Sequence, residues 1–108
     1  MSSNELSTWH AVCAAEDLQT DQPLGVEVAG KPIGLYKLED GSVHALSNIC
    51  THEFALLSNG FVDDARIECP LHQACFEIRT GKCHGPMAET DLQSYPVRIV
   101  DRRVEVAV

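Results

Sequence analysis

The sequence has no apolar run that approaches the roughly 20 residues of a membrane-spanning helix. Its first residues, Met-Ser-Ser-Asn-Glu, lack the basic segment and apolar stretch of a secretory signal. Positive charge is scarce, because eight Lys and Arg residues stand against sixteen Asp and Glu, for a formal net charge of −8. A nucleic-acid-binding protein needs a basic face that displaces phosphate counterions. We therefore expect neither membrane nor nucleic acid as a partner, and an acidic surface that suits solubility or a basic protein.

The chain is too short for two domains of ordinary size, since it has 108 residues. Apolar residues make up 44% and charged residues 22%, which is the balance of a globular protein with one core. It contains no Gly-x-Gly-x-x-Gly motif, so nucleotide-dependent chemistry must belong to a separate protein. We expect a single domain over residues 1–108.

The chain has five cysteines, an odd number, so a fully paired disulfide framework is excluded. In a short chain without a signal segment, reduced thiols and metal ligation are the expected uses of cysteine, which indicates the cytoplasm. Cys13 is predicted to be a small buried residue of a strand. Cys75 and Cys83 could form a disulfide, but reduced thiols are favoured.

What the sequence does contain is a series of short Val-, Ile- and Leu-rich segments separated by turn signals. Asp40-Gly41 is such a signal, because this pair readily adopts the positive φ angles of a tight turn. No long stretch has apolar residues at helical spacing, so we predict an all-β fold, a small antiparallel sandwich or barrel. The expected strands are residues 9–13, 24–28, 32–38, 43–46, 66–68, 75–78, 96–100 and 104–108, with a helical turn or loop at 14–18.

Two segments, residues 48–60 and 69–75, interrupt the strands and contain Cys together with His. The first has Cys50-Thr51-His52, and the second, after sixteen intervening residues, has Cys69-Pro70-Leu71-His72. Two Cys and two His could hold a tetrahedral zinc ion. They could equally hold a [2Fe–2S] cluster with two Cys on one iron and two His on the other. Zinc knuckles usually pair like ligands, whereas each loop here offers one of each, which favours the cluster.

The motif Cys-x-His-x16-Cys-x-x-His resembles that of the Rieske ferredoxins that serve bacterial aromatic-ring-hydroxylating oxygenases. The resemblance extends through residues 69–73, Phe76, 80–82 and 95–97, and weakens before Trp9. It implies a Rieske-type fold whose cluster-binding portion, about residues 48–86, contains two ligand loops. The implied ligands of one [2Fe–2S] cluster are Cys50 and Cys69 on the buried iron, and His52 and His72 on the outer iron.

The resemblance also implies a function. A Rieske ferredoxin of this kind carries single electrons from a flavin-dependent NAD(P)H reductase to a terminal Rieske non-haem iron oxygenase, as a cytoplasmic monomer in aromatic hydrocarbon catabolism. Because both loop histidines, His52 and His72, are used as cluster ligands, the chain is expected to be an electron-transfer component and not an enzyme. Two alternatives stay open, which are the small subunit of an assimilatory nitrite reductase and a structural Cys2His2 zinc module.

Some positions depart from the family pattern, and others match it. Glu53 stands where Gly is common after the first ligand His, and Gln73 stands at the corresponding place after the second. Gly85-Pro86 matches the loop that shields the cluster from water in this family. High-potential relatives brace their loops with a disulfide, at positions occupied here by Ala55 and Leu71. They also direct two hydroxyls at the cluster and its ligand sulfur, from positions occupied here by Ala74 and Phe76, so we expect a low potential.

Overall fold

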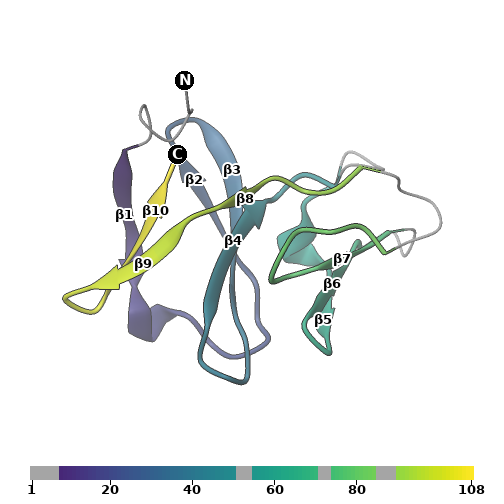
Figure 1. Ribbon diagram of the computed structural model, residues 1–108, viewed down its shortest axis with the longest axis horizontal. Helices are drawn as coiled ribbons and strands as arrows, with labels where there is room; N and C mark the ends of the chain where they lie inside the picture. The colour runs from purple at the N-terminus through teal and green to yellow at the C-terminus, as the bar shows by residue number, and fades with distance from the viewer. Residues whose placement is uncertain (1–7, 51–54, 71–73, 85–89) are drawn as a thin grey trace.

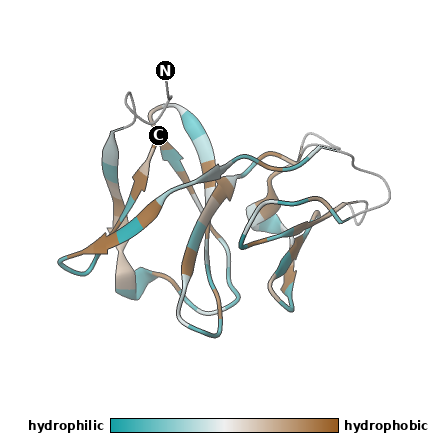
Figure 2. Cartoon of the chain, in the orientation of Figure 1, coloured by the Kyte–Doolittle hydropathy of each residue, from teal (hydrophilic) through white to brown (hydrophobic). Residues whose placement is uncertain are grey.

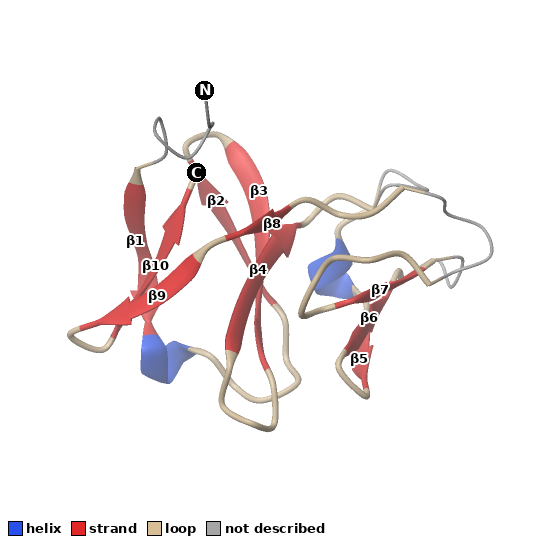
Figure 3. Ribbon diagram, in the orientation of Figure 1, coloured by secondary structure: helices blue, strands red, loops and turns tan. Residues whose placement is uncertain are grey.

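The computed structural model describes residues 8–50, 55–70, 74–84 and 90–108, which form antiparallel sheets arranged in two lobes (Figure 1). A basal lobe contains both described ends of the chain, and a smaller lobe, here called the loop lobe, lies beside it. Within the described residues, strands predominate and the helices are two single 3-10 turns (Figure 3). None of the described helices has the length and apolarity needed to cross a membrane.

Two sheets build the basal lobe. One has the order β1-β10-β9 and the other the order β2-β3-β4-β8, with neighbours antiparallel throughout. Side chains alternate along β3, so that Ile33 and Leu35 reach the basal core, where they meet Val104 and Val106. The strands are β1 (Trp9–Ala14), β2 (Leu24–Val28), β3 (Lys31–Lys37), β4 (Val43–Ser47), β8 (Ser94–Tyr95), β9 (Val97–Val100) and β10 (Arg103–Ala107).

The loop lobe is a three-stranded sheet with the order β5-β6-β7, formed by Phe61–Asp63, Arg66–Glu68 and Cys75–Glu77. Register places Ile67 opposite Phe76, and both are fully buried on its inner face. This face packs against the side of β3 and β4 that does not meet the basal core, because Tyr36 and Leu46 belong to the same core as Ile67 and Phe76. Apolar residues recur along the strands of both lobes (Figure 2). The second core therefore joins the two lobes.

Tight turns connect several of these strands. The pairs Ala29-Gly30, Asp64-Ala65 and Asp101-Arg102 all have positive φ at both residues, between 51° and 80°. Two-residue hairpin turns need this conformation, which matches the right-handed twist of the flanking strands. The predicted turn at Asp40-Gly41 is present, and Gly41 adopts a φ of +87°.

The all-β antiparallel prediction is confirmed, and the predicted bounds of β2 and β6 agree with the structure. Strands β5 and β8 were not predicted, because their three and two residues are too few to show an alternation. Residues 14–18 contain a 3-10 turn, Ala15–Asp17. Cys13 is half-buried against the basal core. Trp9 lies at the rim of its sheet, with the Arg98 guanidinium 4.2 Å from the ring centroid.

Candidate metal centre

The first predicted ligand loop leaves the end of β4 and returns into a 3-10 turn, η3 (Leu57–Asn59). Its two ends are paired through the isolated bridge between Ile49 and Leu56. The Cys50 N–H donates a hydrogen bond to the Ala55 carbonyl at 3.0 Å. Cys50 is therefore held at the point where the loop begins.

The second predicted ligand loop joins β6 to β7 and closes in the same way. The Cys69 N–H donates to the Ala74 carbonyl at 2.9 Å. In both loops the bond runs from the cysteine to the residue five positions later. The two loops thus present their cysteines in equivalent backbone settings, although nineteen positions separate Cys50 from Cys69 in the sequence.

Both cysteines are buried, with 4% of Cys50 and none of Cys69 exposed. They belong to the second core, where Leu57, Ala74 and Phe76 are their apolar neighbours. The fold therefore brings together the two thiols that the sequence assigned to the inner iron. A buried pair of sulfur donors, each on a closed loop, fits thiolate ligation of one iron of a [2Fe–2S] cluster.

The other two predicted ligands, His52 and His72, lie outside the described residues. The same holds for Glu53, Gln73 and the Gly85-Pro86 pair. Each predicted histidine belongs to a loop whose first residue and closing bond are described. The ligand assignment of the histidines stays a prediction.

A third segment pairs with the outer edge of β7. The His84 N–H donates to the Cys75 carbonyl at 2.7 Å, and Phe76 bridges to Cys83. Side chains alternate, so Cys83 faces the core with Phe76, whereas Cys75 faces outward with His84. The two thiols point to opposite faces of the hairpin, a geometry that does not suit a disulfide. Burial raises the pKa of the Cys75 thiol.

His84 has a partner on the outward face. Its Nε2 lies 3.2 Å from Glu77 Oε2, and the Thr80 hydroxyl donates to Glu77 Oε1 at 2.9 Å. The hydrogen bonds from Thr80 and then His84 lower the pKa of Glu77. The His84 ring is therefore tied to the hairpin that precedes residue 85.

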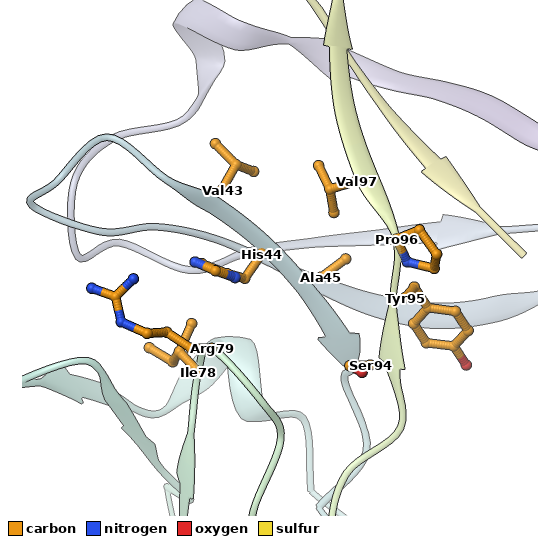
Figure 4. A pocket seen from close by; sticks show the side chains of 9 residues that line it. All are labelled: Val43, His44, Ala45, Ile78, Arg79, Ser94, Tyr95, Pro96 and Val97. Atoms are coloured by element: carbon orange, nitrogen blue, oxygen red, sulfur yellow. The ribbon is translucent and has the colours of Figure 1, made fainter.

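The lobes also meet at a cavity of about 490 Å³, away from the two cysteines (Figure 4). Figure 4 shows His44 and Arg79 on one side of it and Tyr95 on the other. Arg79 forms an ion pair with Asp40 at 3.0 Å, and His44 Nε2 lies 2.8 Å from Ser42 Oγ. Hydrogen bonds from the Ser42 hydroxyl and N–H, together with Arg79, lower the pKa of Asp40 to about 2. Neither Cys50 nor Cys69 lines this cavity, so we regard it as a junction between the lobes.

His44 lies in β4, where it is half-buried, and burial lowers the pKa of its imidazole. Two residues near the first loop went unnoticed in the sequence. They are Asn48, which is 3% exposed, and its hydrogen-bond partner Ser58. The sequence signal that could have drawn attention to Asn48 is its place two positions before the predicted ligand Cys50.

A family model for the Rieske [2Fe-2S] domain matches residues 8–96. The chain belongs to this family. As a Rieske domain it binds one [2Fe–2S] cluster, which excludes the zinc alternative. The buried cysteine pair is the part of that site that the described residues contain.

Similar proteins indicate which class of Rieske protein this chain resembles. The anthranilate 1,2-dioxygenase ferredoxin subunit of Burkholderia cepacia is 40% identical over 110 residues, covering 100% of this chain and 99% of that one. The ferredoxin in a complex of reduced oxygenase and oxidized ferredoxin of carbazole 1,9a-dioxygenase has a TM-score of 0.85 and 34% identity, covering 92% of each chain. A Mycobacterium tuberculosis protein assigned as a nitrite reductase small subunit has a TM-score of 0.85 and 28% identity. The match covers 94% of this chain and 96% of that one.

Proposed function

We propose that this protein is a soluble carrier of single electrons and that Cys50, His52, Cys69 and His72 hold its cluster. Residues 48–86 are the cluster-binding part of a single domain that spans residues 1–108. The cluster, when bound, supplies one-electron redox chemistry. The chain is the electron-transfer component of a multicomponent dioxygenase system and not an enzyme by itself, as its ferredoxin relatives indicate.

One observation carries the ligand proposal. Cys50 and Cys69 begin two loops that are closed by equivalent hydrogen bonds, and both thiols are buried in the same core. A histidine follows each cysteine, at the second position in one loop and at the third in the other. Two loops built alike can each give one ligand to each iron. This arrangement supports thiolate ligation of the inner iron and imidazole ligation of the outer iron.

The partners follow from the relatives. By likeness to the oxygenase-bound carbazole ferredoxin, the electron acceptor is a terminal Rieske non-haem iron aromatic-ring-hydroxylating oxygenase. The resemblance to Rieske ferredoxins implies a flavin-dependent NAD(P)H ferredoxin reductase as the donor, and this reductase is a separate protein because the chain has no nucleotide-binding motif. We infer that the protein works in the cytoplasm, as a monomer, with neither membrane nor nucleic acid as a partner.

The nitrite reductase alternative is less favoured. Two solved structures of that class are 28% and 23% identical to this chain, against 34% for the carbazole dioxygenase ferredoxin. Similar TM-scores mean that the fold alone does not separate the two functions.

Reconstitution tests the proposed function directly. The purified protein is expected to contain about two iron and two sulfide per chain and to give a Rieske-type EPR signal after reduction. Added to the reductase and oxygenase of an anthranilate or naphthalene dioxygenase system, it should restore hydroxylation of the aromatic substrate, and omitting it should abolish product. Activity restored only with a nitrite reductase large subunit would favour the alternative.

The reduction potential is a second expectation. Ala74 and Phe76 occupy the positions of two hydroxyl donors in high-potential relatives, and both side chains are buried in the core that contains Cys50 and Cys69. A donor to a sulfur stabilises the reduced form, so its absence lowers the potential. The wild-type potential should lie in the lower part of the family range of roughly −150 to +300 mV.

Installing the donors should raise that potential. In the variant Ala74→Ser with Phe76→Tyr, we expect an increase on the order of 40 mV per donor, since a net hydrogen bond of about 1 kcal/mol corresponds to that shift for one electron. Protein-film voltammetry measures it, with Cys75→Ser as a control because its side chain faces outward. A wild-type value well above zero, or an unmoved double variant, would contradict this account.

A further inference from the structure

We propose that Asn48 is a positioning residue for the first ligand loop, because its side chain ties the two ends of that loop together. The inference rests on the proposed function, since it concerns the setting of Cys50. Asn48 directly precedes the Ile49-Cys50 pair, and Ser58 lies in η3, after the loop has returned. Among the described residues, Asn48 is the one buried side-chain amide.

Asn48 uses both its side chain and its main chain. Its Oδ1 accepts a hydrogen bond from the Ser58 N–H at 2.8 Å, and its Nδ2 donates to Ser58 Oγ at 2.9 Å. Its carbonyl accepts from the Leu57 N–H at 2.8 Å, and its own N–H donates to the Pro32 carbonyl at 3.0 Å. The residue therefore connects the loop's entrance, the loop's exit and strand β3.

Two glycines make room for this contact. Gly25 in β2 and Gly34 in β3 face each other in register. A Cβ at Gly25 would lie 2.8 Å from Ser58 Oγ and 3.1 Å from Asn48 Nδ2. A Cβ at Gly34 would lie 3.0 Å from Asn48 Oδ1. These separations are too short for ordinary contact, so the paired glycines let the Asn48 and Ser58 side chains settle onto the sheet.

The two ligand loops differ in what holds their ends. The second loop joins β6 and β7, which pair directly at Glu68 and Cys75, so a continuous ladder fixes the position of Cys69. The ends of the first loop meet at an isolated bridge, Ile49 with Leu56, and then diverge into η3. The Asn48–Ser58 bonds lie just outside that bridge. They supply the restraint that strand pairing supplies in the other loop.

Burial makes the restraint strong. A buried amide that loses its partners bears the full cost of desolvation, whereas an exposed amide turns to water. Without the Asn48 side chain, the loop ends can separate, and the geometry at Cys50 becomes less uniform. A loosened ligand should appear as faster cluster loss and as a broader or shifted EPR spectrum of the reduced protein.

The test uses the cluster-loaded full chain and three variants. Asn48→Ala removes both side-chain bonds, and Ser58→Ala removes the bond to Nδ2 while keeping that from the Ser58 N–H. The matched control is Asn59→Ala, because Asn59 is an exposed residue of the same 3-10 turn. The readouts are the rate of iron release to a chelator, followed by visible absorbance, and the EPR spectrum after reduction.

We expect Asn48→Ala to release iron roughly tenfold faster than the wild type, which corresponds to about 1.4 kcal/mol. Ser58→Ala should be intermediate, and Asn59→Ala should match the wild type. A changed EPR spectrum in Asn48→Ala separates positioning from simple loss of stability. If Asn48→Ala does not fold, Ser58→Ala decides, with faster release together with a changed EPR spectrum in support.

Two results would overturn the inference. One is a set of release rates and EPR spectra for Asn48→Ala and Ser58→Ala that equal those of Asn59→Ala. The other is faster release with an unchanged EPR spectrum in both variants, which would indicate general destabilisation. A wild-type protein without an iron–sulfur cluster would instead contradict the proposed function itself, so the two failures are distinguishable.

Tyr36 offers a second control, because its hydroxyl lies close to the same glycine as the Asn48 side chain. The Tyr36 hydroxyl is buried near it and makes no hydrogen bond in the part of the chain that is described, and burial raises the pKa of this phenol. Both the hydroxyl and Asn48 Oδ1 lie about 3 Å from the place of a Cβ on Gly34, at 2.9 and 3.0 Å. Tyr36→Phe should leave iron release and the EPR spectrum unchanged. An effect equal to that of Asn48→Ala would show that any change at this place loosens the loop and would contradict a specific role of Asn48.

Discussion

His52→Ala and His72→Ala, each made alone, are expected to yield a protein without a Rieske cluster. In the proposed ligand set the outer iron has two imidazole ligands from the protein, so each variant removes half of its protein ligation. Neither substitution alters Cys50 or Cys69, which are buried in one core, or the backbone bonds that close the two loops. The expected loss is therefore one of ligation and not of the fold.

Iron and sulfide content, visible absorbance and the EPR spectrum measure this loss. We expect iron to fall from about two per chain to near zero in both variants. His10→Ala and His84→Ala are matched controls, because His10 lies in β1 and the His84 ring contacts Glu77. Both controls should keep the full cluster. A Rieske spectrum that survives His52→Ala or His72→Ala would remove that histidine from the ligand set.

Gly60→Ala is expected to disrupt the loop lobe and, with it, cluster binding. Gly60 has a φ of −90°, which any residue can adopt, so the constraint is space and not conformation. A Cβ there would lie 2.0 Å from the carbonyl oxygen of Glu68. That carbonyl cannot retreat easily, since Glu68 pairs with Phe61 and Cys75 on its two sides and directly precedes Cys69.

The methyl group must therefore push β5 away from β6 or shift the residue that leads into the second ligand loop. Overpacking of this kind costs about 1–3 kcal/mol or more, so the variant should unfold at a lower urea concentration and retain less iron. Gly30→Asn is the control, because nothing lies within 4 Å of a Cβ at that turn and Asn tolerates positive φ. Equal stability and iron content in Gly60→Ala and the wild type would show that the sheet can relax around the added methyl.

Much of the basal lobe was predictable because its signals are local. Alternation over five residues and an Ala29-Gly30 turn are enough to define β2 and the start of β3. The failures occurred where the local signal was short. Strand β8 has two residues and pairs with β4, which lies far away in the sequence, and β5 has only three residues, which are too few to show an alternation.

The cluster ligands were also predictable, because metal chemistry limits which side chains can serve and the two mixed Cys and His loops have a rare spacing. The sequence by itself determined the fold class, the candidate ligands and the family. Tertiary structure decided what depends on residues that meet across the fold. It buried Cys50 and Cys69 in one core, turned Cys75 and Cys83 to opposite faces, and set Asn48 against Ser58 over two paired glycines. The physical reason is that side-chain direction and burial depend on strand register and packing, which arise only when separate segments come together.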